Sequence, residues 1–154
     1  MRHLRTYDKQ KLLSPKDVED LVCRLAEEGK NLPLELMYLH GAHARGVQTP
    51  LSDLDIAAFL VKERIEDRHG YVELLGRLQS ISGREDIDLL ILNTAGPIIK
   101  DRVVRYGRLV YARTERERIL FEASAIKEAI DYRYFSRTYD DALFTQISEG
   151  RYLG

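Results

Sequence analysis

Little in the sequence ties the protein to an oxidising compartment, a membrane or a polyanion. Cys23 is the only cysteine, so no disulfide can form within the chain, which fits a reducing compartment. Neither the first residues nor any later segment forms an apolar run of signal-peptide or membrane-spanning length. The formal net charge is −1, which gives no overall attraction to nucleic acids or acidic membranes. We therefore expect a cytoplasmic protein that binds no membrane and makes no direct contact with nucleic acid.

The composition is that of a soluble globular protein. Of the 154 residues, 44% are hydrophobic and 32% are charged, and a chain of this length can bury a core without disulfide or metal staples. The sequence contains no internal repeat and no low-complexity segment, and it needs no linker. We predict a single domain over residues 1–154, with its core at about 34–125 and a C-terminal helix and aromatic tail over 115–154.

Apolar runs and helical patterns alternate along the chain. Short apolar runs bounded by glycine or proline predict strands at residues 34–39, 53–61, 87–92 and 108–112. Helical spacing and start or stop residues predict helices at 15–29, at about 72–82 and at 97–106. The alternation of strands and helices places the chain in the α/β or α+β class.

A long last helix follows the fourth predicted strand. It begins with the capping-box pattern Thr114-x-x-Glu117, and we expect it to continue to about Tyr139. Its apolar stripe is formed by Ile119, Ala123, Ile126, Ile130 and Tyr134. Aromatic residues gather in the same stretch, at Tyr132, Tyr134, Phe135, Tyr139, Phe144 and Tyr152. Some of these aromatic side chains belong to the core, and those left exposed would suit a protein interface, where tyrosine is enriched.

A glycine turn and a pair of carboxylates lie between the first two predicted strands. Gly41 follows the apolar run 34–39, and a residue without a Cβ lets backbone approach a phosphate closely. Asp53 and Asp55 open the next run, and side chains at i and i+2 of a strand point to the same face. Two carboxylates on one face can hold Mg²⁺, which prefers oxygen ligands and substrate phosphates. This pattern indicates a nucleotide site.

A second pair of acids opens the third predicted strand. Asp86 and Asp88 could bring a third carboxylate to the same edge of the sheet as Asp53 and Asp55. Like charges at close range are costly, so such a cluster usually needs cations. The alternative is that Asp86 and Asp88 are ordinary acids at the start of a strand that face solvent.

Cationic side chains flank the glycine turn. The guanidinium of Arg45 beside a phosphate-sized turn can neutralise charge on a triphosphate, although a surface arginine is the common alternative. His40 and His43 flank Gly41, but two histidines with neither a cysteine nor a third ligand make a weak zinc site. We expect His40 to belong to the end of the strand.

These motifs together resemble the minimal nucleotidyltransferases of the DNA polymerase beta superfamily, and in particular the MNT antitoxins of HEPN/MNT toxin–antitoxin pairs. In that family a strand leads into Gly-Ser, ten residues follow, and Asp-x-Asp opens the next strand, with a third Asp on a neighbouring strand. Here ten residues, 43–52, separate Gly41-Ala42 from Asp53-Leu-Asp55, and Asp88 stands in the later strand. The resemblance covers about residues 34–125.

The resemblance implies a fold, a set of ligands and roles for individual residues. The family fold is a small mixed sheet of about four strands flanked by helices, here with a long C-terminal helix. By position, Asp53, Asp55 and Asp88 would be the catalytic carboxylates and would bind two Mg²⁺ ions. Gly41, Ala42 and Arg45 would bind the phosphates of ATP, the nucleotide substrate.

One residue departs from the family pattern: the serine of Gly-Ser is Ala42 in this chain. Losing that hydroxyl removes one phosphate hydrogen bond, worth roughly 0.5–3 kcal/mol, while the backbone N–H remains. Our hypothesis is that backbone amides, Arg45 and His43 still hold the phosphates. The departure also favours a second reading, in which a catalytically weak protein acts by binding alone.

The resemblance further implies an acceptor and a partner. Antibiotic nucleotidyltransferases of the superfamily carry a further helical domain, for which the chain after Ala112 is short, so we expect a protein acceptor. MNT antitoxins pair with HEPN ribonuclease toxins and neutralise them by adding AMP to a toxin tyrosine. We therefore expect a Mg²⁺-dependent protein adenylyltransferase acting on a HEPN toxin. A small-molecule nucleotidyltransferase is a further alternative, and a homo-oligomer and a hetero-complex both stay open.

Overall fold

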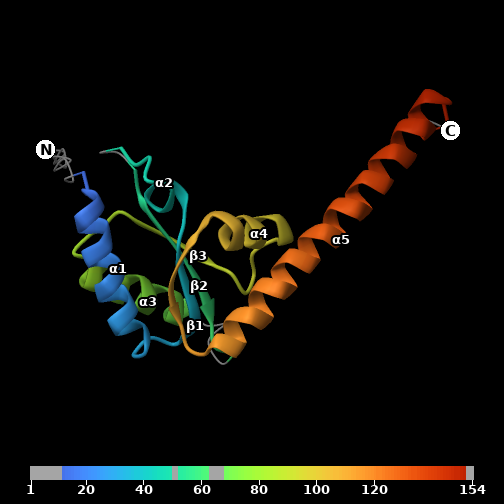
Figure 1. The fold of residues 1–154 in the computed structure, drawn as a ribbon. Coiled ribbons are helices and arrows are strands. Elements are labelled where there is room, and N and C mark those ends of the chain that lie inside the picture. The colour runs from blue at the N-terminus through green and yellow to red at the C-terminus, as the bar shows by residue number, and fades with distance from the viewer. Residues whose placement is uncertain (1–11, 50–51, 63–67, 152–154) are drawn as a thin grey trace, which may run out of the picture.

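The computed structural model describes residues 12–49, 52–62 and 68–151. Four strands and five helices are found in this part of the chain (Figure 1). Their order is α1 (Pro15–Gly29), β1 (Leu34–Leu39), α2 (Gly41–Arg45), β2 (Leu54–Leu60), α3 (Arg68–Ser82), β3 (Ile87–Ile91), α4 (Pro97–Tyr106), β4 (Arg108–Ala112) and α5 (Glu115–Ser148). All four predicted strands are present, each within one residue of its expected ends. Residues 1–11 and Tyr152, on which parts of the domain and aromatic-tail predictions fall, lie outside the described residues.

The four strands form one mixed sheet in the order β3-β2-β1-β4. β1 runs antiparallel to both of its neighbours, β2 and β4, whereas β2 and β3 run parallel, with α3 as the crossover between them. β1 and β2 are central and almost entirely buried, which explains why their sequences read as continuous apolar runs. The prediction of a small mixed sheet flanked by helices is confirmed.

Helices cover both faces of the sheet (Figure 1). On one face α1 and α3 pack against alternate strand residues such as Leu54 and Ile56. On the other face α4 and α5 pack against the residues between them, such as Ala57 and Tyr38. Because side chains alternate along a strand, Asp55 shares the face of Ala57 and therefore lies on the α4 and α5 side of the sheet.

The predicted helix starts are present in the structure. The Ser14 hydroxyl accepts a hydrogen bond from the N–H of Asp17, and the Asp17 carboxylate accepts one from the N–H of Ser14, so the start of α1 is a complete capping box. At the start of α5 the Thr114 hydroxyl accepts from the N–H of Glu117 at 3.1 Å. These caps satisfy backbone donors that the first helical turn leaves free.

α5 differs from its prediction in length and in the face that it buries. The helix ends at Ser148 rather than at about Tyr139, because no glycine or proline stops it before Gly150. The predicted stripe is wrong as a buried face: Ile119 is 53% exposed and Ile130 is 56% exposed. The buried face of α5 is instead formed by Phe121, Ala125 and Ala129.

A buried carboxylate joins α4 to α5. Asp101 of α4 is 1% exposed, and it accepts hydrogen bonds from Arg105 Nε one turn later and from Arg133 Nη2 on α5, both at 2.7 Å. Burial by itself would raise the pKa of the Asp101 carboxyl, but the hydrogen bonds from Arg133 and Arg105 outweigh it and hold that pKa below its ordinary value. Asp101 therefore fixes how α4 lies on α5.

Within residues 12–49, 52–62 and 68–151, no helix is both long enough and apolar enough to cross a membrane.

Replacing the buried acid tests this anchor. Asp101→Asn removes the charge that two arginines share, and we expect it to lower the free energy of unfolding by about 1–3 kcal/mol in urea titrations. Asp131→Asn breaks the exposed pair with Lys127 within α5 and should leave stability near that of the wild type. Because the Asp101 pKa is lowered in the folded state, the difference in unfolding free energy between Asp101→Asn and the wild type should shrink as the pH falls below about 4. Equal stability of the two variants at neutral pH would contradict the anchor.

Candidate functional site

The candidate site begins where β1 ends. His40 follows the strand, as expected, and its N–H donates to the Asp55 carbonyl at 3.0 Å. Gly41 then starts the short helix α2 with a φ of +68°, a conformation that favours glycine. A Cβ at this position would lie 2.0 Å from Asp55 Oδ2. The predicted glycine turn is therefore the start of a helix, and the absence of a side chain lets the Asp55 carboxylate lie against the backbone.

The strand register brings two of the three predicted carboxylates together. Asp55 and Asp88 are direct partners in the parallel β2–β3 pair, so both side chains lie on the α4 and α5 face. Asp53, just before β2, is exposed and falls on the same side by the i, i+2 alternation. Burial raises the pKa of the Asp55 carboxyl and the charges of Asp88 and Asp53 raise it further, while His40 opposes them. The three acids therefore share one electrostatic environment.

Asp86 is not part of this cluster. It pairs with the Arg84 guanidinium, which donates from Nε to Asp86 Oδ1 at 2.7 Å and also from Nη2 to Oδ2. Of the two interpretations of Asp86, an ordinary acid at the start of a strand is therefore the correct one.

The two histidines beside Gly41 have different surroundings. His40 is half-buried, and burial lowers the pKa of its imidazole, although the nearby carboxylates of Asp55 and Asp88 raise it. His43 is only 5% exposed, burial lowers the pKa of its imidazole, and within the described residues its buried Nδ1 has no hydrogen-bond partner. A role of His43 in holding a phosphate stays a prediction.

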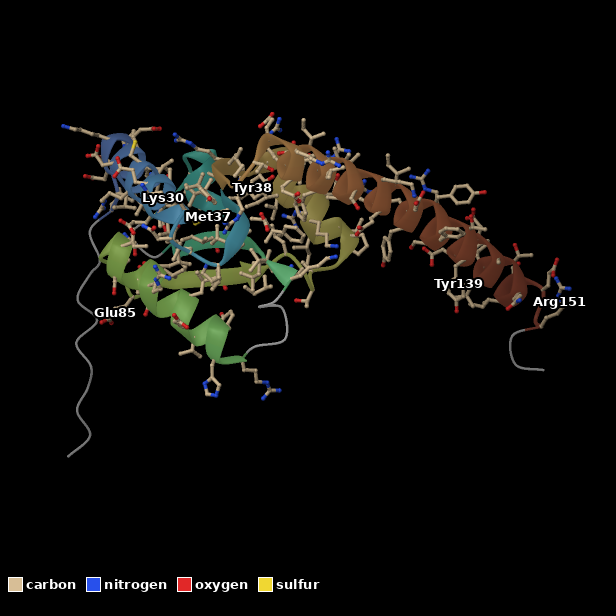
Figure 2. All side chains as sticks on the ribbon, turned by 90° about the horizontal axis from the view of Figure 1, so that it is seen from below. Lys30, Met37, Tyr38, Glu85, Tyr139 and Arg151 are labelled. Atoms are coloured by element: carbon tan, nitrogen blue, oxygen red, sulfur yellow. The ribbon has the colours of Figure 1, made fainter. Side chains whose placement is uncertain are left out.

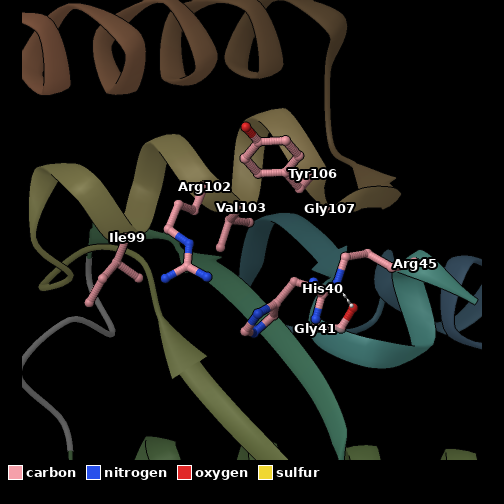
Figure 3. Close-up of a pocket in the computed structure, with 8 residues that line it drawn as sticks. All are labelled: His40, Gly41, Arg45, Ile99, Arg102, Val103, Tyr106 and Gly107. Carbon is pink, nitrogen blue, oxygen red and sulfur yellow. Dashed lines mark hydrogen bonds between the residues drawn. The ribbon is translucent and has the colours of Figure 1, made fainter. Parts of the chain in front are cut away.

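A cavity of about 480 Å³ opens beside Gly41 (Figure 3). Arg45 lines it from α2, where its Nε donates to the Gly41 carbonyl at 3.3 Å. The opposite wall is one face of α4, formed by Ile99, Arg102, Val103 and Tyr106. Sequence reasoning missed this wall, although the spacing of its residues by three and four positions marks one helical face.

The donor set at this edge fits a hard cation. Within the described residues no three histidine, cysteine, aspartate or glutamate side chains converge closely enough to form a finished metal site. Asp55 and Asp88 nevertheless offer carboxylate oxygens on one face with Asp53 on the same side, and a cation would offset the repulsion between like charges there. That these three acids hold Mg²⁺ stays a prediction.

Comparisons with known proteins concern the family and the fold. The sequence model of the family "Polymerase beta, Nucleotidyltransferase" matches residues 25–116. A chain of a solved toxin–antitoxin structure with AMP-PNP superposes with a TM-score of 0.62 at 25% identity, and the match covers 86% of this chain and 99% of that one. No curated protein matches the sequence.

Two further structures show the same fold. A chain from the complex of tri-AMPylated HEPN toxin with MNT antitoxin of Shewanella oneidensis has a TM-score of 0.58 at 23% identity, covering 84% of this chain and 97% of that one. A chain of the toxin–antitoxin MntA-HepT has a TM-score of 0.58 at 22% identity, covering 85% and 99%.

The contact between Gly41 and Asp55 can be separated from backbone strain. Gly46 has nearly the same φ, +67°, but a Cβ there would meet nothing within 4 Å. Gly41→Ala and Gly46→Ala should therefore both lose about 1–2 kcal/mol of stability from the left-handed backbone. Only Gly41→Ala should also displace the Asp55 carboxylate and abolish calorimetric binding of Mg²⁺-AMP-PNP. Equal binding by the two variants would refute a role for this contact.

Proposed function

The chain belongs to the polymerase beta nucleotidyltransferase family, and from this premise we propose that it transfers AMP from ATP to a tyrosine hydroxyl of a HEPN-type ribonuclease toxin and so neutralises it. The observation that carries the proposal is the convergence of Gly41, Asp55 and Asp88 at one edge of the sheet. The similarity to chains from toxin–antitoxin structures, one with AMP-PNP and one with a tri-AMPylated toxin, supports the nucleotide and the partner.

Each site residue has a role in this proposal. Backbone N–H groups at Gly41 and Ala42 and the Arg45 guanidinium bind the β and γ phosphates, leaving the α phosphorus toward the carboxylates. Asp53, Asp55 and Asp88 would hold Mg²⁺, which supplies charge stabilisation for the attacking and leaving oxygens when bound. Asp88 is exposed, so its carboxylate can accept the proton of an incoming hydroxyl. The tyrosine oxygen forms a bond to the α phosphorus, and pyrophosphate leaves.

The outer half of α5 provides a surface for the partner. The face of α5 that is buried at Phe121, Ala125 and Ala129 continues at helical spacing along the outer half of the helix. We call this outer part the α5 seam; it consists of Tyr132, Ser136, Tyr139 and Leu143. Tyr132 is 52% exposed and Tyr139 is 68% exposed, because α5 extends beyond the body of the protein (Figure 2). A face that is core in one half and uncovered in the other suits packing against a helix of a partner.

Co-expression with the product of the adjacent reading frame tests the transfer. If that product is the toxin, intact mass spectrometry should show steps of one AMP on it. Asp53→Asn should abolish these steps, because it removes a carboxylate needed for Mg²⁺. The control is Asp86→Asn, an acid at the start of β3 that Arg84 holds outside the cluster, and it should keep the steps.

Two other outcomes select the alternatives. Toxin neutralisation that survives Asp53→Asn and Asp55→Asn together, with no change in toxin mass, would replace catalysis by stoichiometric binding, the function that Ala42 favours. Transfer of AMP to a small molecule with no protein partner present would instead identify a small-molecule nucleotidyltransferase.

The α5 seam has its own test. Tyr132→Glu combined with Tyr139→Glu should abolish co-purification of the partner, because charged side chains would enter an apolar contact. Tyr134 is equally exposed but lies on the opposite side of the helix, so Tyr134→Glu is the matched control and should keep the partner. Loss of the partner in the control alone would contradict this assignment.

A further inference from the structure

One face of α4 lines the cavity beside Gly41 and has no role in the site as described so far. Ile99, Arg102, Val103 and Tyr106 follow one another at intervals of three, one and three residues and all border the cavity. Of these side chains, only Val103 is buried, at 3% exposure, where it fixes the helix to the sheet. Arg102 and Tyr106 are exposed at the cavity wall.

The two arginines of α4 differ in their pairing. Arg105 is held by the buried Asp101 on the side of α5. Arg102 lies nearly a full turn earlier, and within the described part of the chain no carboxylate forms an ion pair with it. An unpaired guanidinium at the wall of a cavity is free to bind an anion bidentately.

Arg102 lines the same cavity as His40 and Gly41, the residues that join β1 to α2. Figure 3 shows His40 between Arg102 on α4 and Arg45 on α2. The backbone N–H of His40 donates to the Asp55 carbonyl at 3.0 Å, and the Asp55 carboxylate lies against Gly41. The cavity therefore has an arginine on each side, and two of its lining residues, His40 and Gly41, contact Asp55.

The remaining lining is apolar and aromatic. Ile99 is 47% exposed and Tyr106 is 67% exposed, although both belong to the helix that walls the cavity. The exposed ring of Tyr106, at the C-terminal end of α4, offers a flat surface on which a planar base can stack. The cavity volume of about 480 Å³ lies within the range of small-molecule sites.

We propose that α4 forms the second wall of the nucleotide site, with Arg102 as a second phosphate-binding cation opposite Arg45 and Tyr106 as the stacking surface for the base. The ligand class is a nucleoside triphosphate, so this inference rests on the proposed function. Affinity for the nucleotide would then depend also on α4, a helix that lies outside the Gly41-Ala42 and Asp53-x-Asp55 motif. Asp101 fixes that helix to α5, so the wall is in place before the ligand binds.

Calorimetric binding to the purified full chain, with no partner present, tests the wall. Arg102→Ala should weaken Mg²⁺-AMP-PNP at least about tenfold, and Arg102→Lys should weaken it less. Tyr106→Ala should also weaken the nucleotide, whereas Tyr106→Phe should bind as the wild type does because stacking needs only the ring. Inorganic tripolyphosphate separates the two roles, since its affinity should fall in Arg102→Ala and stay unchanged in Tyr106→Ala.

The control variants are Arg116→Ala and Tyr134→Ala, which remove an exposed arginine of α5 and a tyrosine of α5 as exposed as Tyr106, and both should bind as the wild type does. If wild-type protein binds AMP-PNP and Arg102→Ala binds equally well, the α4 wall is refuted while the proposed function stands. If Arg102→Ala keeps nucleotide affinity but loses AMP transfer, the wall holds the acceptor instead, which also overturns the inference. Absence of any binding by the wild type would refute the nucleotide site as a whole.

Discussion

The contact on which the candidate site depends is the approach of the Asp55 carboxylate to the backbone of Gly41. It exists because the antiparallel β1–β2 pairing places the end of one strand beside the start of the other, with Leu39 opposite Ile56. At the turn that follows β1, only a residue without a Cβ leaves room for the carboxylate. The parallel β2–β3 pairing then sets Asp88 next to Asp55. Three chain segments are thus brought to one edge by backbone hydrogen bonds.

The sheet face on which these carboxylates lie is also the face that α4 and α5 cover. Val103 and Phe121 pack into the same apolar cluster as Tyr38, so both helices are fixed to the central strands. The Tyr38 hydroxyl donates to Glu122 of α5 at 3.0 Å, and burial raises the pKa of that hydroxyl. Beyond this apolar cluster, a cavity lies between α4 and the residues that follow β1.

Sequence reasoning succeeded where local signals decide the structure. The apolar runs are bounded by Pro33, Gly41 and Gly107, so the predicted strand positions are accurate to within one residue. It failed for α5 because apolar residues occur on two sides of that helix. The buried side packs against distant residues such as Tyr38 and Val103, and no local pattern contains these contacts.

The α4 wall escaped sequence reasoning for a related reason. Arg102 and Tyr106 are ordinary residues for an exposed helix face, and nothing in their spacing distinguishes a cavity wall from a solvated surface. Only the packing of Val103 against the sheet turns this face toward Gly41. The resemblance likewise gave positions for the acids but could not show that Asp86 pairs with Arg84.

In the proposed site, Asp53, Asp55 and Asp88 form, with Gly41, a metal and nucleotide centre at the edge of the sheet. Paramagnetic broadening of amide NMR signals tests it directly, because Mn²⁺ takes the same oxygen ligands as Mg²⁺. With AMP-PNP and substoichiometric Mn²⁺, we expect the amide signals of Gly41, Asp55 and Asp88 to broaden first. The signals of Asp140 and Asp141, acids at the outer end of α5, should persist. Broadening centred on α5, or spread evenly over the exposed acids, would contradict a metal site at Asp53, Asp55 and Asp88.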